Sequence, residues 1–238
     1  MLSFQNQIVV VTGAAGNLGQ AVVRAFQSTG AHLVLVDRKP DRLPALYPDL
    51  AGSPDHILAT SIDLGNELAV ATLTKEIVER FGRIDVLVNT VGGYRAGTPI
   101  QETSLTDWDF MLELNARTAF IISRAVVPTM LDQGEGRIVH VASRAALEGG
   151  SRAAAYSASK SALLRLTESL SAELKRKGIR VNCVLPGTID TPQNREAMPN
   201  AKFDRWVTPE AVADVILFLT SDAARGIHGA AIPVYGTS

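Results

Sequence analysis

The segment Ile8-Val-Val-Val-Thr-Gly-Ala-Ala-Gly-Asn-Leu-Gly19 decides the fold, because a short apolar run enters a glycine-rich turn there. Its five consecutive β-branched residues, Ile8 to Thr12, are typical of a strand that is buried on both faces. A helical pattern opens directly after the turn, with apolar residues at Leu18, Ala21, Val22, Ala25 and Phe26. We expect Gly30 to cap the C-terminal end of this helix. The chain therefore begins with a strand, a tight turn and a helix.

The same alternation of strand and helix continues to the end of the chain. The expected strands are Ile8–Val11, His32–Val36, Ile57–Ile62, Asp85–Val88, Arg137–Val141, Arg180–Leu185 and Ala231–Val234. The expected helices that follow the first one cover about Glu67–Phe81, Thr106–Leu131, Ala153–Lys177 and Pro209–Leu219. Repeated strand–helix–strand units form right-handed crossovers and a parallel sheet. The sequence predicts one α/β domain over residues 1–238, with a Rossmann-type doubly wound parallel sheet of about seven strands.

One segment, about Thr188–Val207, follows neither period, because Pro192, Pro199 and Asn200 interrupt both. A loop of this length in a compact domain usually serves as a lid or a binding element. We therefore expect a substrate lid at about 188–207.

Composition narrows the classes of partner. Apolar residues make up 46% of the chain and the formal net charge is -1, without a basic block or an acidic tail. Neither nucleic acid nor an anionic membrane surface is therefore an expected partner. No apolar run approaches the roughly 20 residues that span a bilayer, and the first residues lack signal-peptide character, so we expect a cytoplasmic protein. The single cysteine, Cys183, cannot form an internal disulfide and is expected to be a small buried apolar residue.

The glycine-rich turn has the chemistry of a dinucleotide site. Glycines let backbone amides approach a pyrophosphate at the positive N-terminus of a helix. A second signal is Asp37, which ends the next strand 18 positions beyond Gly19. A carboxylate there accepts hydrogen bonds from ribose hydroxyls and repels a 2′-phosphate, which favours NAD over NADP. Arg38 is evidence for the opposite preference, because its guanidinium could bind that 2′-phosphate. The alternative interpretation of Asp37 is a residue that forms a turn.

Tyr156-Ser-Ala-Ser-Lys160 lies in a helical pattern, so the phenol and the ammonium share one helix face. A free tyrosine titrates near pH ~10, and a fixed cation nearby favours the phenolate. The pair is therefore a candidate proton-transfer unit for alcohol and carbonyl chemistry. Taken alone, the same spacing also fits an exposed helix pair.

When all these motifs are taken together, the chain resembles a short-chain dehydrogenase/reductase over nearly its whole length. The similarity rests on residues that occur in the family's order: the glycine turn, Asp37, Asp63, Asn89 with Gly92, Asn115, Ser143, Tyr156 with Lys160, and Pro186-Gly187. The resemblance implies hydride transfer between a nicotinamide and a small carbonyl or secondary alcohol, with NAD as the expected cofactor and NADP less expected. No metal site is predicted.

The resemblance also implies roles for single residues. Tyr156 would be the general acid/base, Ser143 would bond the substrate oxygen, Lys160 would bind the nicotinamide ribose and lower the tyrosine pKa, and Asn115 would hold a water in the proton relay. The implied cofactor-binding residues are Gly13, Gly16, Asn17, Leu18, Gly19, Asp37, Arg38, Asp63, Leu64, Asn89, Gly92, Tyr156, Lys160, Pro186, Gly187, Thr188, Ile189 and Thr191. The alternatives are structural: Ser143 as a cap, Asn115 as a helix-kink residue and Asp63 as a turn former.

Two positions depart from the family pattern. The family loop has glycine where this chain has Asn17, with Gly16 one residue early, and the usual Asn-Asn-Ala-Gly reads Asn89-Thr-Val-Gly92. Both departures leave the detailed geometry of the pyrophosphate and adenine contacts open.

The lid has a narrower similarity. Asp190-Thr-Pro-Gln-Asn-Arg-Glu-Ala-Met-Pro199, followed by Phe203 and Trp206, resembles the corresponding stretch of dihydropteridine reductases. With Met198 and Tyr94, these aromatic residues could form a flat-ring pocket or simply pack the lid itself. A dihydropteridine reductase-like enzyme is therefore one alternative function, and a catalytically inactive dinucleotide sensor is another.

The helices expected around Thr106–Leu131 and Ala153–Lys177 carry more apolar positions than one sheet face can cover. In the family that this chain resembles, such helices pair between subunits. We therefore expect a homotetramer, with a dimer as the runner-up.

Overall fold

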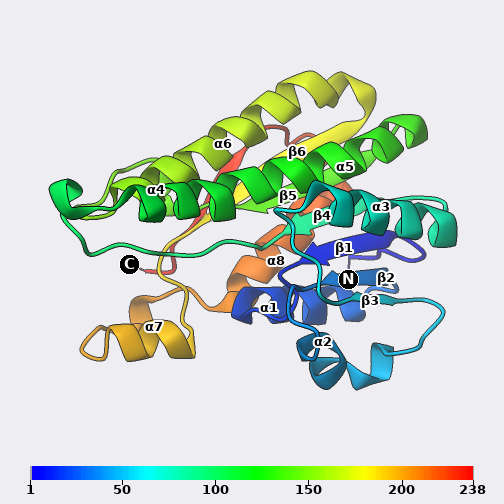
Figure 1. Cartoon of the computed structure of the whole chain (residues 1–238). Helices are drawn as coiled ribbons and strands as arrows, with labels where there is room; N and C mark the ends of the chain where they lie inside the picture. Colours follow the sequence, from blue (N-terminus) through cyan, green and yellow to red (C-terminus); the bar gives the residue numbers. More distant parts are fainter. Residues whose placement is uncertain (1, 238) are drawn as a thin grey trace.

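Seven parallel strands form one sheet in the order β3-β2-β1-β4-β5-β6-β7 (Figure 1). The computed structural model describes residues 2–237. The strands are β1 (Ile8–Thr12), β2 (His32–Val36), β3 (Ile57–Ala59), β4 (Val86–Asn89), β5 (Gly136–Val141), β6 (Ile179–Pro186) and β7 (Ala231–Val234). The strand order reverses between β1 and β4, and ligands of open α/β sheets bind at such a switch point. The predicted fold class is confirmed.

Helices cover both faces of the sheet (Figure 1). They are α1 (Asn17–Gln27), α2 (Arg42–Leu46), α3 (Glu67–Phe81), α4 (Leu105–Leu112), α5 (Thr118–Gln133), α6 (Ala154–Leu174), α7 (Pro192–Ala197) and α8 (Pro209–Thr220). Residues of α1 and α8 pack on one face, and residues of α3 and α5 pack on the other. A π-helical turn, Glu113–Arg117, joins α4 to α5, so the expected single helix over Thr106–Leu131 changes its winding in the middle.

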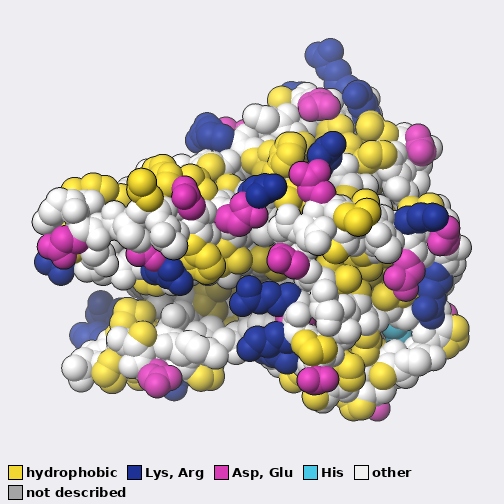
Figure 2. Space-filling view, viewed as in Figure 1, with side chains coloured by type: hydrophobic (Ala, Val, Ile, Leu, Met, Phe, Trp, Pro, Cys, Tyr) yellow, Lys and Arg dark blue, Asp and Glu magenta, His cyan; other side chains and the backbone are white. Residues whose placement is uncertain are grey.

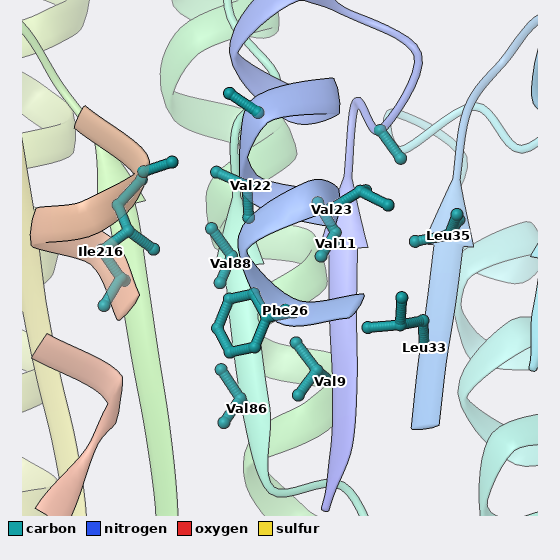
Figure 3. Close-up of a cluster of buried hydrophobic side chains, with 14 of the residues drawn as sticks. Val9, Val11, Val22, Val23, Phe26, Leu33, Leu35, Val86, Val88 and Ile216 are labelled. Carbon is teal, nitrogen blue, oxygen red and sulfur yellow. The ribbon is translucent and has the colours of Figure 1, made fainter. Parts of the chain in front are cut away.

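The strands are buried on both faces, as their β-branched sequences predict. Val9 and Val11 of β1 point to α1, where Phe26 lies against them (Figure 3). Ile8 and Val10 of the same strand belong to the opposite core beneath α3 and α5. Successive side chains of a strand face opposite sides, so a central strand needs an apolar residue at every position.

Three local expectations are wrong. Helix α1 ends at Gln27 with Ser28 as its cap, and Gly30 lies beyond it with a φ of +82° in the turn to β2. Strand β3 stops at Ala59 rather than Ile62, because Ser61 takes a left-handed backbone (φ 59°) that no strand continues. Pro192 does not interrupt structure: it is the first residue of α7, where its missing N–H costs nothing.

The expected lid therefore has structure of its own. Helix α7 is capped by the Thr191 hydroxyl, and the short 3₁₀ turn Phe203–Arg205 follows it. An isolated bridge pairs Ile189 with Val207 and closes the base of the segment. Because both ends of the segment are tied together, it stands out from the domain as a hairpin-like flap beside α1 (Figure 1).

Two further expectations can be compared with the described residues. Cys183 is buried in β6 as predicted, and burial raises the pKa of its thiol to about 12. Within residues 2–237, no helix combines the length and the apolar character that a membrane crossing requires.

One buried charge ties the last helix to the sheet. Arg180 of β6 is 7% exposed, and its guanidinium donates to the carbonyl oxygens of Leu219, Thr220, Ser221 and Ala224 at 2.7–3.3 Å. Carbonyls at a helix C-terminus have no partner within the helix, so the guanidinium supplies donors to Leu219 and Thr220 at the end of α8 and adds a second donor to Ser221 and Ala224. Burial lowers the pKa of Arg180, although the group stays charged at neutral pH.

We expect Arg180→Met to lower the free energy of unfolding by about 3 kcal/mol or more, because several buried carbonyls lose their donor at once. Urea denaturation followed by circular dichroism measures this change. Arg24→Met is the matched control: Arg24 is in an exposed ion pair with Glu210, and its loss should cost less than about 1 kcal/mol. Equal costs for the two variants would contradict the capping role of Arg180.

Candidate active site

The glycine turn between β1 and α1 brings a helix N-terminus to the edge of the sheet. Gly13 has a φ of +65°, and a Cβ at Gly19 would lie 2.1 Å from the Gly13 carbonyl oxygen. These two positions therefore require glycine. Gly16 has an ordinary φ of -74° as the cap of α1, and Asn17 is the first helical residue. The departure from the family pattern is thus tolerated, because the two glycines that the geometry requires are present.

A cavity of about 550 Å³ lies in front of this turn. It is lined by Gly13, Gly16, Asn17, Leu18, Gly19, Val36, Asp37, Arg38, Lys39, Arg42, Ile62, Asp63, Leu64, Thr90, Val91, Gly92, Leu114 and Thr118. Figure 2 shows a hollow in this region of the surface, between the part that carries α4 and the part that carries α7. Its volume is in the range of small-ligand sites. The amides at the start of α1, which attract anions, fit the pyrophosphate of a dinucleotide.

Two carboxylates that were expected to contact the cofactor line the cavity and also stabilise turns. Asp37 accepts a hydrogen bond from the Lys39 amide at 2.9 Å, and Asp63 accepts one from the Gly65 amide at 2.9 Å. The turn role and the cavity role are therefore compatible in the structure.

Several residues around the glycine turn were missed in the sequence. Arg42 donates to the Ala15 carbonyl at 2.5 Å, and the Tyr47 hydroxyl donates to the Ala14 carbonyl at 2.9 Å. Thr90, which replaces the second Asn of the family motif, donates to the Thr12 carbonyl at 2.7 Å. Only Thr90 had a signal in the sequence, as a departure from a known pattern. Arg42 begins and Tyr47 ends a short helix, α2, that was not expected.

Tyr156 lies in the first turn of α6, with the ring of Tyr94 packed edge-on at 4.8 Å between centroids. Ser143 precedes the 3₁₀ turn Arg144–Ala146 and caps it, accepting from the Ala145 amide at 3.2 Å. Burial raises the pKa of Tyr156, and a hydrogen bond with Ser143 lowers it in part. The structure therefore joins the two residues that were expected to act on the substrate oxygen.

The pKa of Tyr156 differs from the expectation, because its shift is upward and Lys160 is not among its causes. Lys160 is 4% exposed, and its Nζ donates to the Val141 carbonyl at 3.0 Å. The ammonium is thus directed at the end of β5. Burial lowers the pKa of Lys160 to about 8.

Asn115 belongs to the π-helical turn between α4 and α5 and is fully buried. Its Oδ1 accepts from the Gly93 amide at 2.9 Å, and its Nδ2 donates to the Gly93 carbonyl at 3.1 Å and to Ser159 Oγ at 3.0 Å. Asn115 therefore lies where the helix changes its winding and bonds the loop next to Gly92, and its role in a proton relay stays a prediction. A Cβ on Gly92 would lie 2.9 Å from Asn115 Oδ1 and 3.0 Å from Lys160 Nζ. Gly92 thus lies between the cavity and the side chains of Asn115 and Lys160.

Eight of the expected cofactor residues do not line the cavity as it stands among residues 2–237: Asn89, Tyr156, Lys160, Pro186, Gly187, Thr188, Ile189 and Thr191. Those after β6 hold the lid backbone, since Thr188 accepts from Val207 at 3.1 Å and Thr191 caps α7. The lid itself meets the glycine turn through Gln193, whose Oε1 accepts from Asn17 Nδ2 at 2.6 Å.

The aromatic residues of the lid pack on each other. The rings of Phe203 and Trp206 are 4.9 Å apart, and the Arg195 guanidinium lies 4.9 Å from the Phe203 ring. Tyr94 contacts Tyr156 rather than these rings. This arrangement matches the packing alternative for the lid residues and does not assemble a flat-ring pocket from them.

Comparisons with known proteins agree with this geometry. The profile of the family described as short chain dehydrogenase matches residues 7–202. A meso-2,3-butanediol dehydrogenase from Serratia marcescens is 35% identical over 243 residues, covering 99% of this chain and 95% of the relative. A (2S)-[(R)-hydroxy(phenyl)methyl]succinyl-CoA dehydrogenase subunit from Thauera aromatica is 33% identical over 246 residues, covering 99% and 97%.

A solved structure of a short-chain type dehydrogenase/reductase from Mycobacterium ulcerans superposes with a TM-score of 0.91 at 28% identity, covering 99% of this chain and 90% of that one. The fold, the order of the motifs and the relatives therefore agree over nearly the whole length. The chain belongs to the short-chain dehydrogenase/reductase family and is an oxidoreductase of the class that acts on CH–OH and C=O groups.

Proposed function

We propose that this enzyme transfers a hydride between NAD(H) and a small carbonyl or secondary alcohol, with Tyr156 as the general acid/base. The observation that carries the proposal is the half-buried Tyr156–Ser143 pair, one helical turn from Lys160, together with a cavity fit for a dinucleotide. Gly92 lines that cavity and is in close contact with Lys160 and Asn115. An inactive dinucleotide sensor would not need this buried polar arrangement.

Reduction of a carbonyl requires a proton donor at the substrate oxygen. The bound dinucleotide supplies the hydride, and reduction of a carbonyl builds negative charge on the substrate oxygen. Tyr156 donates the proton to that oxygen, and the Ser143 hydroxyl fixes its position by a second hydrogen bond. Because burial raises the pKa of Tyr156, its phenol is protonated at neutral pH and ready to donate in the reducing direction. Lys160, which lies behind Gly92, would bind a ribose hydroxyl of the dinucleotide.

The choice of NAD over NADP rests on Asp37. Its carboxylate lines the cavity at the end of β2, where it would accept hydrogen bonds from the adenosine ribose and repel a 2′-phosphate. Arg38, Lys39 and Arg42 line the same end of the cavity. Of these, Arg42 is engaged with the Ala15 carbonyl, so it supports the glycine turn.

The substrate is proposed only as a class. The two relatives named above are a diol dehydrogenase and a dehydrogenase of a CoA ester, which differ greatly in the size of their substrates. The packed Phe203–Trp206 pair does not favour a pterin site. Turnover of NADH and of NAD against a panel of carbonyls, alcohols and a quinonoid pterin tests this assignment.

We also propose a homotetramer, with a dimer as the runner-up. Large apolar side chains remain exposed on α4 and α5: Leu105, Trp108, Phe110, Phe120 and Leu131. Exposed apolar surface on neighbouring helices is typical of an association face. Light scattering at micromolar concentration measures the mass, and a monomer would contradict the proposal.

We expect Tyr156→Phe to reduce turnover by about 10²–10⁴-fold, the usual contribution of a positioned acid/base, while cofactor binding persists. Ser143→Ala should reduce kcat more than it weakens the affinity for NADH. Steady-state kinetics and NADH fluorescence titration measure the two effects, with thermal melting as the folding control. A Tyr156→Phe enzyme with near wild-type kcat would show that another group donates the proton.

We expect the wild type to prefer NAD(H), and Asp37→Ala or Asp37→Ser to shift kcat/KM toward NADP(H) by roughly 10–100-fold. The physical reason is the loss of charge-assisted hydrogen bonds to the ribose together with the loss of repulsion toward a 2′-phosphate. Kinetics with both cofactors measure the ratio. Comparable kcat/KM values for the two cofactors in the wild type would contradict the assignment.

Lys160 should show a conflict between stability and function. Its pKa falls from 10.5 to about 8 on folding, so its charge costs about 3 kcal/mol at pH 7. The folded-state pKa is the lower one, so the cost is full below pH 8 and disappears as the pH rises to 10.5. We expect Lys160→Met to lose turnover yet gain about 1–2 kcal/mol of stability at pH 7. The gain is smaller than the full cost of the charge because the Val141 carbonyl loses its donor.

Urea denaturation at pH 7 and near the upper end of that range measures the gain, which should shrink at the higher pH. The exposed Lys175 provides the matched control, because Lys175→Met removes a charge that was never desolvated. A Lys160→Met protein that is less stable than the wild type at pH 7 would show that the buried ammonium is well compensated.

A further inference from the structure

A row of hydrogen-bonding side chains, Thr12, Asn89, His140 and Ser123, crosses the sheet behind the proposed catalytic residues. Asn89 ends β4, and His140 lies opposite it in register on β5. Both side chains are 0% exposed. They project from the face covered by α5, as do Leu87 and Ile138 two positions earlier. A fully buried histidine between two strands is costly unless both of its ring nitrogens have a function.

Each end of this row of side chains is hydrogen-bonded to a neighbouring element. At one end, Thr12 Oγ1 donates to Asn89 Oδ1 at 2.5 Å, and Thr12 is the residue before the glycine turn. At the other end, His140 Nε2 lies 3.3 Å from Ser123 Oγ of α5, and Ser123 donates to the Ala119 carbonyl at 2.7 Å.

These contacts determine where the imidazole proton lies. A carbonyl only accepts, so the one hydrogen of the Ser123 hydroxyl is used on Ala119. The hydroxyl must then accept from His140, so Nε2 carries the proton. Burial and the nearby charge of Lys160 lower the pKa of His140 to about 4, so the ring is neutral and Nδ1 holds a bare lone pair.

The remaining atoms are complementary. Within residues 2–237, the donor Asn89 Nδ2 and the acceptor His140 Nδ1 have no hydrogen-bond partner, and they do not bond each other directly. They belong to register partners on one face of the sheet. A buried donor and a buried acceptor that both lack partners are costly, whereas one water that bridges them removes both costs.

We propose that His140 is a positioning residue of the dinucleotide site, whose Nδ1 is bridged to the Asn89 amide by one buried water, and so holds that amide on Thr12. The inference rests on the proposed function, since the glycine turn after Thr12 is the proposed pyrophosphate site. Without an acceptor at position 140, the Asn89 amide turns and Thr12 loses its partner. Cofactor affinity then falls more than kcat, because Tyr156 and Ser143 lie outside this chain of hydrogen bonds.

Two substitutions separate the hydrogen bond from the packing. His140→Phe fills the same space without an acceptor, whereas His140→Asn places an amide oxygen near the position of Nδ1. We expect His140→Phe to raise the Kd for NADH by about 5–20-fold, with kcat within about threefold of wild type. His140→Asn should return the Kd to within about threefold. Ile138→Val, on the same face of β5, is the packing control and should lower Tm with no change in Kd.

The tautomer gives a test that does not require a variant to fold. In ¹⁵N NMR of the unliganded wild type, we expect a protonated Nε2 and an unprotonated Nδ1 for His140 throughout the neutral range. The reverse tautomer, or wild-type affinity in His140→Phe, would overturn the role of His140. A wild type that binds neither NADH nor NADPH would instead overturn the proposed function, and the positioning role with it.

Discussion

The contact between the start of α1 and the end of β1 is the constraint on which the site depends. A side chain at position 19 would collide with the Gly13 carbonyl, only 2.1 Å from the place of its Cβ. With two glycines the helix can begin directly at the sheet edge, where the strand order reverses. The positive helix end then faces the cavity. Asp37 and Gly92, which follow β2 and β4, reach the same cavity because parallel strands end at the same edge.

Buried polar side chains behind this edge hold the loop at Gly93, helix α6 and strand β5 in place around the site. Asn115 holds Gly93 by two hydrogen bonds and Ser159 by a third, while Lys160 holds the end of β5. The π-helical turn gives Asn115 this reach, because an extra residue in one turn changes the direction of the side chains. Burial of Lys160 lowers its pKa, so its charge is unfavourable for folding, and the proposed function gives a reason to keep it. The core of Val, Leu and Phe around α1 offsets such costs (Figure 3).

Asn17, which departs from the family pattern, has a hydrogen-bond partner in the segment 188–207. Asn17 stands where the family has glycine, and its amide meets Gln193 of α7 at 2.6 Å. The two residues are 176 positions apart, so no local pattern relates them. Proline at the start of α7 and threonine as its cap turn an apparent breaker into a helix start. The flap that results carries its own aromatic pair, which packs internally instead of lining a pocket.

Much of this protein is determined by the sequence itself. The β-branched runs, the helical spacing and the glycine turn were sufficient for the sheet, its direction and one domain, since these depend on local preference and burial. The order of Asn115, Ser143, Tyr156 and Lys160 was sufficient for the family. Only the tertiary structure decided the direction of the Lys160 ammonium, the upward pKa of Tyr156 and the partners of Asn89 and His140. Desolvation and hydrogen bonding depend on what surrounds a group in space, and residues distant in the sequence supply those surroundings.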